Sequence, residues 1–187
     1  MRQIGLIGAG NMGSAILHGV VADGTIRAAQ LTVYDVNRKR LEELGNETPG
    51  ITLARTSQEL AQQCDMLILA VKPHFIMDVI DDIRLCLNGK AVISIAAGWT
   101  VSMLADALSG TGATYLRVMP NTPAMVGEGM TALCDDSTFS KEDFAFAKSL
   151  FDALGRTVVL PERVFDGVTA ISGSSPAYVF MMIEAMA

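Results

Sequence analysis

Short apolar runs alternate along this chain with longer segments in which apolar residues recur every three to four positions. The runs predict buried strands, and the longer segments predict amphipathic helices. Predicted strands occupy residues 2–7, 31–34, 51–54, 66–71, 91–95, 114–119, 130–134 and 156–160. Predicted helices occupy residues 11–21, 37–44, 57–62, 74–87, 100–108 and 140–154. Strands that alternate with helices through short loops predict an α/β fold built on a doubly wound, mostly parallel sheet.

The pattern changes after Pro161. Residues 162–170 predict a helix, residues 172–176 a turn, and residues 177–187 a strongly apolar helix without a capping residue at its end. An apolar helix needs a partner that covers it. We therefore expect residues 1–161 to form one domain and residues 162–187 to begin an all-α domain that continues in a longer protein.

Three glycines between the first strand and the first helix fit the spacing G-x-G-x-x-G. Gly8 permits the tight turn, Gly10 lets the backbone approach a pyrophosphate, and Gly13 lets the helix pack against the strand. The N–H groups at the start of that helix favour a phosphate. This context predicts a dinucleotide site on a Rossmann-type sheet. The alternative is a glycine turn that binds nothing.

The residues after the second strand bear on the choice of cofactor. Asp35 lies about 20 residues beyond the glycines, where a carboxylate can bind a ribose hydroxyl. Asn37 and Arg38 follow at once, with Lys39 and Arg40 behind them, and an arginine there can pair with a 2′-phosphate. The basic cluster can equally be an exposed helix face. We expect NADPH to be preferred and NADH to be accepted.

Ligands of such folds bind beyond the carboxyl ends of the parallel strands. Lys72 follows the fourth strand, where a site role competes with that of a solvated loop lysine. Asn121 follows the sixth strand, and a site role is there as well supported as an Asx turn. His74 fits a helix start on the surface better than a proton donor, so no catalytic residue is assigned.

Composition narrows the functional classes. The 187 residues carry a net charge of −6 and show no basic stripe, which argues against nucleic acid as a partner. No apolar run has the length that a bilayer requires, and no signal-peptide pattern opens the sequence. Three cysteines and two histidines show no metal-ligand spacing, so no metal site is expected. We expect a cytoplasmic enzyme with reduced thiols and a small-molecule substrate.

Five stretches together resemble one enzyme family. They are Ile-Gly-Ala-Gly-Asn-Met at 7–12, Ala-Val-Lys-Pro at 70–73, Ile-Ala-Ala-Gly at 95–98, Arg-Val-Met-Pro-Asn-Thr-Pro at 117–123 and Ile-Ser-Gly-Ser-Ser-Pro-Ala-Tyr at 171–178. The last two are the specific ones, and the likeness covers the whole chain. The chain resembles pyrroline-5-carboxylate reductases, which complete proline synthesis.

The resemblance implies hydride transfer from NAD(P)H to the C=N bond of 1-pyrroline-5-carboxylate, which gives L-proline. It also implies a helical dimerisation domain and a homo-oligomer built on dimers. We accordingly expect the chain ending at Ala187 to be poorly active by itself. Asp35 departs from the pattern, because many NADPH-preferring relatives lack an acid there. The proton for the imine nitrogen has no assigned donor, and solution can supply it.

The residues and the resemblance together give two sets of candidate site residues. The residues expected to bind the cofactor are Ile7, Gly8, Ala9, Gly10, Asn11, Met12, Gly13, Asp35, Asn37, Arg38, Ser57, Ala70, Val71, Lys72, Pro73, Ile95, Ala96 and Ala97. The residues expected near the substrate are Asn121, Glu162, Ser174 and Ser175. The resemblance places Ser57 near the adenine and the residues of the strand ends along the ribose and nicotinamide.

Two other functions remain open at this point. A β-hydroxyacid-type dehydrogenase shares the sheet but needs a lysine on the helix of its second domain, and residues 172–187 contain none. A nucleotide-sensing module without catalysis would need no substrate site, but it does not account for the stretch at 171–178.

Overall fold

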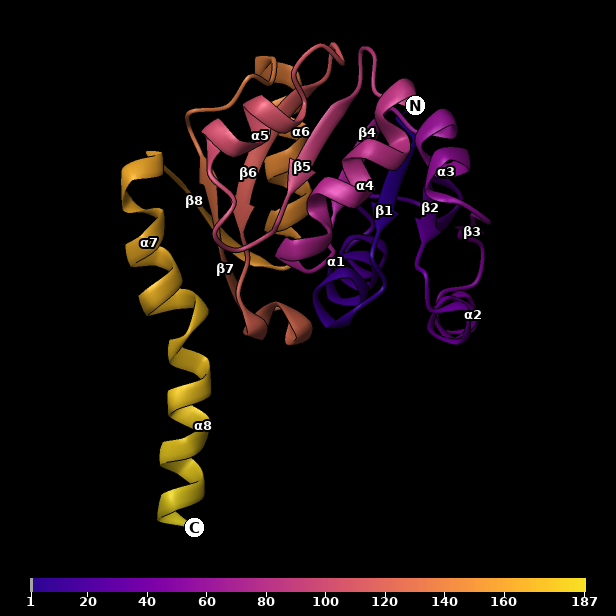
Figure 1. Ribbon diagram of the computed structural model, residues 1–187. Coiled ribbons are helices and arrows are strands. Elements are labelled where there is room, and N and C mark those ends of the chain that lie inside the picture. Colours follow the sequence, from indigo (N-terminus) through magenta and orange to yellow (C-terminus); the bar gives the residue numbers. More distant parts are fainter. Residues whose placement is uncertain (1) are drawn as a thin grey trace.

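The structure is a computed structural model that describes residues 2–187 and places in them one eight-stranded sheet with helices on both faces (Figure 1). The strand order is β3-β2-β1-β4-β5-β6-β7-β8. Strands β1 to β6 run parallel, β7 runs antiparallel to β6, and β8 runs parallel to β7. The bounds are Ile4–Ile7, Leu31–Tyr34, Thr52–Leu53, Met66–Leu69, Ala91–Ser94, Thr114–Met119, Gly129–Cys134 and Gly155–Leu160, from β1 to β8.

The central strands are buried on both faces, as continuous apolar runs predict. In β4, Met66 and Ile68 pack in one core cluster with α1, α2 and α6, whereas Leu67 and Leu69 pack in the other with α3, α4 and α5. Successive side chains point to opposite faces, so one strand serves both clusters. The helices are α1 Asn11–Ala22, α2 Arg38–Glu47, α3 Ser57–Gln63, α4 Ile76–Ile83, α5 Val101–Ala107 and α6 Lys141–Asp152.

The sheet confirms the predicted α/β class and locates the ligand crevice. β1 pairs with β2 on one side and with β4 on the other, so the strand order reverses there. A doubly wound sheet binds its ligands at the carboxyl ends of the strands beside such a point. The added strand expected at 130–134 is present as β7, and the strand expected at 51–54 is reduced to two residues.

Ser57 has the residue type of an N-cap for α3, but the residue before it holds that position. Thr56, and not Ser57, caps the helix, because its side chain accepts a hydrogen bond of 3.0 Å from the Glu59 N–H. Ser57 is the first helical residue, and its hydroxyl donates to Asp82 on α4. Both residue types favour caps, so composition alone could not choose between neighbours.

The helix predicted over 74–87 is interrupted. It consists of a 3₁₀ turn at Pro73–Phe75, α4 at Ile76–Ile83 and a second 3₁₀ turn at Arg84–Cys86. Pro73 opens the first turn, where a missing N–H costs nothing.

The turn predicted over 172–176 is reduced to Ser174, which lies between two helical elements, and Pro176 stands in the first turn of the last helix. A 3₁₀ turn at Glu162–Val164 leads through α7 (Phe165–Val168) and a π-helical turn (Thr169–Gly173) into α8 (Ser175–Met186). The Ser174 N–H bonds the Thr169 carbonyl at 3.0 Å, five residues back. In a regular α-helix the ring of Pro176 would clash with the carbonyl four residues before it, and the wider turn gives it room.

Candidate dinucleotide-binding site

The glycine turn between β1 and α1 needs two of its three glycines for space. A Cβ on Gly8, whose φ is +109°, would lie 2.5 Å from the Ala70 carbonyl oxygen. A Cβ on Gly13 would lie 2.0 Å from the Gly8 carbonyl oxygen. A Cβ on Gly10 would meet nothing within 4 Å. The first and third glycines therefore allow close packing, and the middle one faces open space.

The N-terminus of α1 fits a phosphate group. Its N-cap residue, Gly10, supplies no side-chain cap, and the first intrahelical bond runs from the Ser14 N–H to the Gly10 carbonyl at 2.8 Å. The N–H groups that precede this bond point out of the helix end and carry its positive dipole. An anion at this position would accept from them without displacing a side chain.

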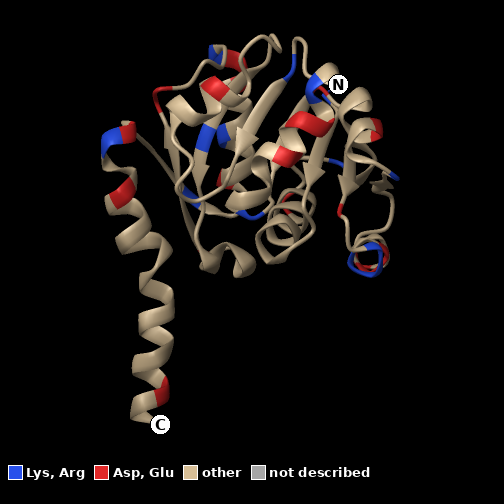
Figure 2. Ribbon diagram, viewed as in Figure 1, with Lys and Arg blue, Asp and Glu red and all other residues tan. Residues whose placement is uncertain are grey.

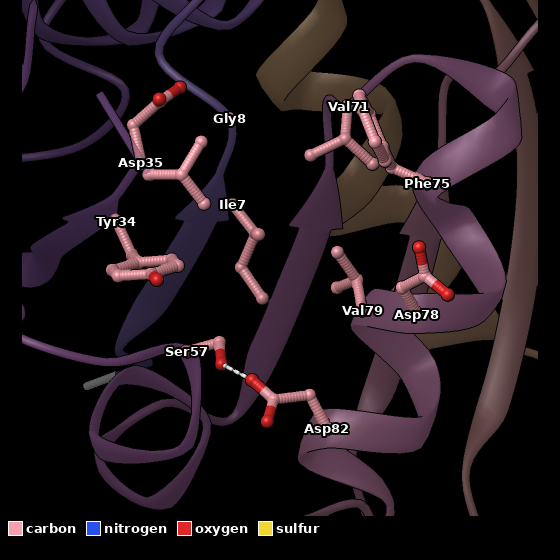
Figure 3. A pocket seen from close by; sticks show the side chains of 11 residues that line it. Ile7, Gly8, Tyr34, Asp35, Ser57, Val71, Phe75, Asp78, Val79 and Asp82 are labelled. Carbon is pink, nitrogen blue, oxygen red and sulfur yellow. Dashed lines mark hydrogen bonds between the residues drawn. The ribbon is translucent and has the colours of Figure 1, made fainter.

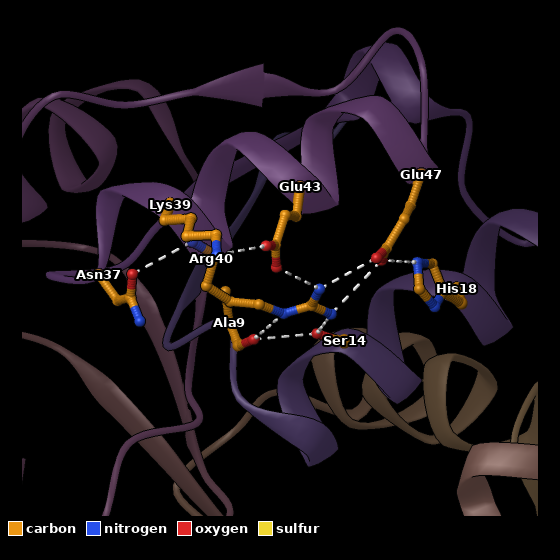
Figure 4. A network of polar contacts seen from close by, with 8 residues as sticks. All are labelled: Ala9, Ser14, His18, Asn37, Lys39, Arg40, Glu43 and Glu47. Atoms are coloured by element: carbon orange, nitrogen blue, oxygen red, sulfur yellow. Dashed lines mark hydrogen bonds and ion pairs between the residues drawn. The ribbon is translucent and has the colours of Figure 1, made fainter.

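The Ala9 peptide in this turn is held from both sides. Its N–H donates to Asp35 Oδ2 at 2.6 Å. Its carbonyl accepts from Ser14 Oγ at 3.0 Å and from Arg40 Nε at 3.2 Å (Figure 4). The other carboxylate oxygen of Asp35 accepts from the Asn37 N–H at 2.7 Å. The turn is thus fixed by contacts from β2 and α2 before a ligand arrives.

Arg40 belongs to a network on α2 and not to the cofactor pocket (Figure 4). Its Nη1 lies 3.0 Å from Glu47 Oε1, and its Nη2 donates to Ser14 Oγ at 2.9 Å. The hydrogen bond with Glu47 raises the pKa of Arg40 and lowers the pKa of Glu47. His18 Nε2 lies 3.4 Å from the same carboxylate. Arg40 is therefore committed to bracing the turn.

Arg38 lies closer to the pocket. Its guanidinium donates to the carbonyls of Ala54 and Arg55 and lies 5.9 Å from the ring centroid of Tyr34, which lines the pocket. Asn37 caps α2 by accepting from the Arg40 N–H at 3.2 Å.

A cavity of about 380 Å³ adjoins the glycine turn beyond the ends of β1, β2 and β4 (Figure 3). Its walls are mostly apolar, and carboxylates lie at its margins. Its lining consists of Ile7, Gly8, Tyr34, Asp35, Val36, Ser57, Val71, Phe75, Asp78, Val79 and Asp82. Five of the predicted cofactor residues are thus brought together around one cavity: Ile7, Gly8, Asp35, Ser57 and Val71.

Six residues of this lining were not predicted from the sequence: Tyr34, Val36, Phe75, Asp78, Val79 and Asp82. Asp78 and Asp82 stand one helical turn apart on α4, and this spacing puts them on one face. That signal was present in the sequence. The sequence did not show which face of α4 borders the crevice.

The remaining predicted cofactor residues lie at neighbouring strand ends. Lys72 and Pro73 follow β4, and the Pro73 carbonyl accepts from the Trp99 Nε1–H at 2.9 Å. Ile95 to Ala97 follow β5, which is the next strand in the sheet. These positions form the edge beside the glycine turn but do not line the cavity.

The four predicted substrate-side residues also lie outside the cavity lining. Asn121 forms no Asx turn: its Nδ2 donates to Ser172 Oγ at 3.1 Å, and its Oδ1 accepts from the Met130 N–H at 2.9 Å. Ser174 donates to the Thr169 carbonyl at 3.2 Å, and Ser175 opens α8. Proximity of these residues to a substrate stays a prediction.

Glu162 connects three elements. Its Oε1 lies 2.7 Å from Arg117 Nη1 on β6 and accepts from the Val101 N–H of α5 at 2.5 Å. Arg117 is only 5% exposed, and its guanidinium lies 4.6 Å from the ring centroid of Phe165 on α7. The carboxylate therefore joins the sheet to the start of the helical segment.

No helix among residues 2–187 combines the length and the apolar character needed to cross a bilayer.

Comparisons with known proteins agree with this geometry. Residues 3–98 match the family model described as NADP oxidoreductase coenzyme F420-dependent, and residues 162–187 match the model of pyrroline-5-carboxylate reductase dimerisation. The pyrroline-5-carboxylate reductase of Escherichia coli K12 is 43% identical over 187 residues, which are 100% of this chain and 69% of the relative. That of Methanosarcina acetivorans is 38% identical over 100% of this chain and 68% of its own length.

A solved structure is similar as well. The crystal structure of Plasmodium falciparum pyrroline carboxylate reductase with NADP bound aligns with a TM-score of 0.87 at 32% identity, over 98% of this chain and 67% of the other. The chain belongs to the pyrroline-5-carboxylate reductase family.

Proposed function

We propose that this chain binds a reduced nicotinamide dinucleotide along the carboxyl edge of its sheet and reduces 1-pyrroline-5-carboxylate to L-proline. The observation that carries the proposal is the open N-terminus of α1 beside a cavity large enough for a nucleoside. The relatives named pyrroline-5-carboxylate reductase support the substrate. The cytoplasmic location expected from the sequence stays a prediction.

Each part of the edge has a task in this proposal. The glycine turn binds the pyrophosphate, the cavity binds the adenosine, and the ends of β4 and β5 lie along the nicotinamide side. The bound cofactor supplies the hydride. The chain itself binds and orients the two reactants and excludes water from between them. We assign no proton donor for the imine nitrogen, and solution supplies that proton.

The experiment is an assay of NADPH oxidation on addition of 1-pyrroline-5-carboxylate, with L-proline detected as the product. We expect slow turnover by the 187-residue chain and faster turnover when it is extended by the E. coli sequence that lies beyond the match. Cofactor binding with no proline from either chain would contradict the reductase and favour a nucleotide-sensing module.

We further propose that NADPH is preferred and NADH accepted. Both carboxylate oxygens of Asp35 accept hydrogen bonds from backbone N–H groups, so its role in this structure is to hold the turn. The Arg38 guanidinium lies 5.9 Å from the ring centroid of Tyr34, which lines the pocket together with Val36, a residue that is 84% exposed. A guanidinium at this position suits a 2′-phosphate.

This preference predicts the effect of Arg38→Gln. The substitution should weaken NADPH binding about tenfold and leave NADH binding unchanged, because only the first cofactor carries the 2′-phosphate. Lys39→Gln is the matched control, since it makes the same change of charge on the same helix, and the Lys39 side chain is 87% exposed with its Nζ 3.9 Å from Glu43. Titration calorimetry gives the six dissociation constants, for the natural chain and the two variants with each cofactor. An equal loss for both cofactors would contradict the assignment.

We also propose that the exposed helix α8 mediates self-association. Large apolar side chains along it are more than half exposed, among them Tyr178, Phe180, Met181, Met182 and Met186. Figure 1 shows α8 extending away from the sheet. The match to the dimerisation model covers this helix and supports a second copy of the chain as the partner. Residues 162–187 would then be the start of the helical domain that the sequence predicts.

A further inference from the structure

The loops that follow β4 and β5 leave the sheet side by side. The two strands carry no charged residue (Figure 2) and pair in parallel, with Leu69 opposite Ser94. Their ladder ends with a hydrogen bond of 3.3 Å from the Ile95 N–H to the Leu69 carbonyl. Residues 70–73 and 96–99 continue past this bond, along the part of the edge where the proposed function places the nicotinamide. A contact beyond the ladder is needed to hold the two loops at a fixed separation.

Trp99 supplies such a contact. Its Nε1–H donates to the Pro73 carbonyl at 2.9 Å, so a side chain of the second loop bonds the backbone of the first. The same carbonyl accepts from the Ile76 N–H at the end of the 3₁₀ turn. A carbonyl oxygen has two lone pairs, and these two bonds use both of them. The Trp99 N–H in turn bonds the Ala96 carbonyl at 3.3 Å, within its own loop.

The indole of Trp99 is anchored in the core. It is 7% exposed and packs in one cluster with Ala96 and Ile76, against which Val71 of the first loop is also packed. A buried indole has few orientations open to it and requires an acceptor for its N–H. Gly98, just before it, is exposed and has a φ of +79°. The loop thus turns sharply at the open edge and then enters the core, from which Trp99 fixes the position of the loop after β4.

We propose that Trp99 is a positioning residue for hydride transfer, because its indole N–H holds Pro73 and the loop after β4 in place beside the nicotinamide. This inference rests on the proposed function, which places the nicotinamide at this edge. Trp99 does not line the cavity and lies apart from the glycine turn, so it acts through Pro73 and not on the cofactor directly. A misplacement of about 1 Å between reacting atoms can lower a rate on the order of a hundredfold.

The experiment follows a single turnover in the chain extended by the E. coli sequence, as described above. NADPH is equimolar to the chain, both are far above the dissociation constant, and 1-pyrroline-5-carboxylate is in excess. The rate constant of NADPH oxidation reports hydride transfer, and the amplitude counts the folded chains that hold the cofactor. A residue that only stabilises the fold changes the amplitude, whereas a positioning residue changes the rate constant.

Two substitutions are compared with the natural chain. Trp99→Phe removes the N–H and keeps an aromatic ring. Thr111→Val is the matched control, because Thr111 is 8% exposed and its Oγ1 donates to the Leu108 carbonyl at 2.7 Å, before β6 at the opposite edge of the sheet. Each variant therefore loses one side-chain bond to a backbone carbonyl. Benzothienylalanine at position 99, in which sulfur replaces the N–H, removes the same donor with the bicyclic shape kept and decides the outcome if Trp99→Phe does not fold.

Removal of the indole N–H should lower the rate constant about tenfold with the amplitude retained. Thr111→Val should keep the natural rate constant. The dissociation constant of NADPH should change by less than about twofold in both variants, because Trp99 does not contact the glycine turn or line the cavity. A natural rate constant without the indole N–H, or equal slowing by Thr111→Val, would overturn the inference alone. Absence of proline formation by the natural extended chain would overturn the proposed function as well.

Discussion

The glycine turn and helix α8 differ in whether contacts within the chain hydrogen-bond and bury their polar and apolar groups. At the turn, the Ala9 peptide bonds to Asp35, Ser14 and Arg40, and the Ala9 side chain is fully buried. Along α8, Met181 is 66% and Met186 70% exposed. The turn is shaped by its own chain in advance of a ligand. The helix instead presents apolar area that only another surface can remove from water.

The largest effect is expected from a charge placed on α8, which should weaken self-association. Phe180→Glu should raise the dissociation constant of self-association on the order of a hundredfold, because it would bury an unpaired carboxylate among apolar side chains. Glu184→Gln, on the same helix, should have little effect. Analytical ultracentrifugation over a range of concentrations measures both. A natural chain that stays monomeric at every concentration would contradict the role of α8.

Two glycine substitutions test the shape of the turn. Gly13→Ala should lower the free energy of unfolding by about 3 kcal/mol, because its methyl would meet backbone and not a movable side chain. Gly10→Ala should change it by less than about 0.5 kcal/mol, since that position has a φ of −68° and open space. Urea denaturation measures both.

Gly10→Ala should nevertheless weaken NADPH binding about tenfold, because the methyl would stand where the pyrophosphate approaches the backbone. A stable Gly10→Ala chain with natural affinity would show that phosphate does not bind at this turn.

Substitutions in the ion pair that joins the sheet to the helical segment should change the free energy of unfolding less than Gly13→Ala does. Glu162→Gln should destabilise the chain by about 2 kcal/mol, because Arg117 would keep a buried charge without its carboxylate. Asp152→Asn removes the exposed ion pair with Lys148 and should cost less than about 0.5 kcal/mol. The same urea experiment compares them, and equal costs would argue against a structural role of the buried pair.

The smallest expected effect concerns two thiols. Cys64 packs in the core beside α3, whereas Cys134 packs under Phe165 of α7. Burial raises the pKa of each to about 11, so both are protonated at neutral pH and their reaction with a thiol reagent accelerates as the pH rises toward that value.

Because the two pKa values agree, a difference in labelling rate reports opening of the structure around each thiol. Cys134 should react about fivefold faster than Cys64 at a given pH, since only its cover belongs to the projecting helical segment. Mass spectrometry of the labelled peptides gives the rates. Equal rates would show that the helical segment opens no more readily than the core.

The sequence predicted the sheet because its strong signals are local. The apolar run predicted as a strand over 66–71 suits a strand buried on both faces, and the spacing of Gly8, Gly10 and Gly13 fits a strand before it and a helix after it. These signals predicted the glycine turn, whereas the resemblance to a known family was needed to propose Ser57.

What the sequence could not predict depends on contacts between distant residues. Arg117 and Glu162 are 45 positions apart, and no local pattern pairs them. The stretch at 172–176 has the composition of a turn, but long-range contacts such as Asn121 with Ser172 accompany a helical path. Asp82 of α4 contacts Ser57 of α3 across 25 positions of the sequence, and no local pattern predicts this contact.

The reversed direction of β7 and β8 affects how the last helix, α8, is rotated about its own axis. Because β8 runs opposite to β6, the chain leaves it near Arg117 and returns as a helix toward Asn121, at the far end of β6. Glu162 and Ser172 attach this returning segment at two points. One residue inserted between them would rotate everything beyond by about 100°. The number of residues in that short span therefore sets the direction in which the apolar side chains of α8 face.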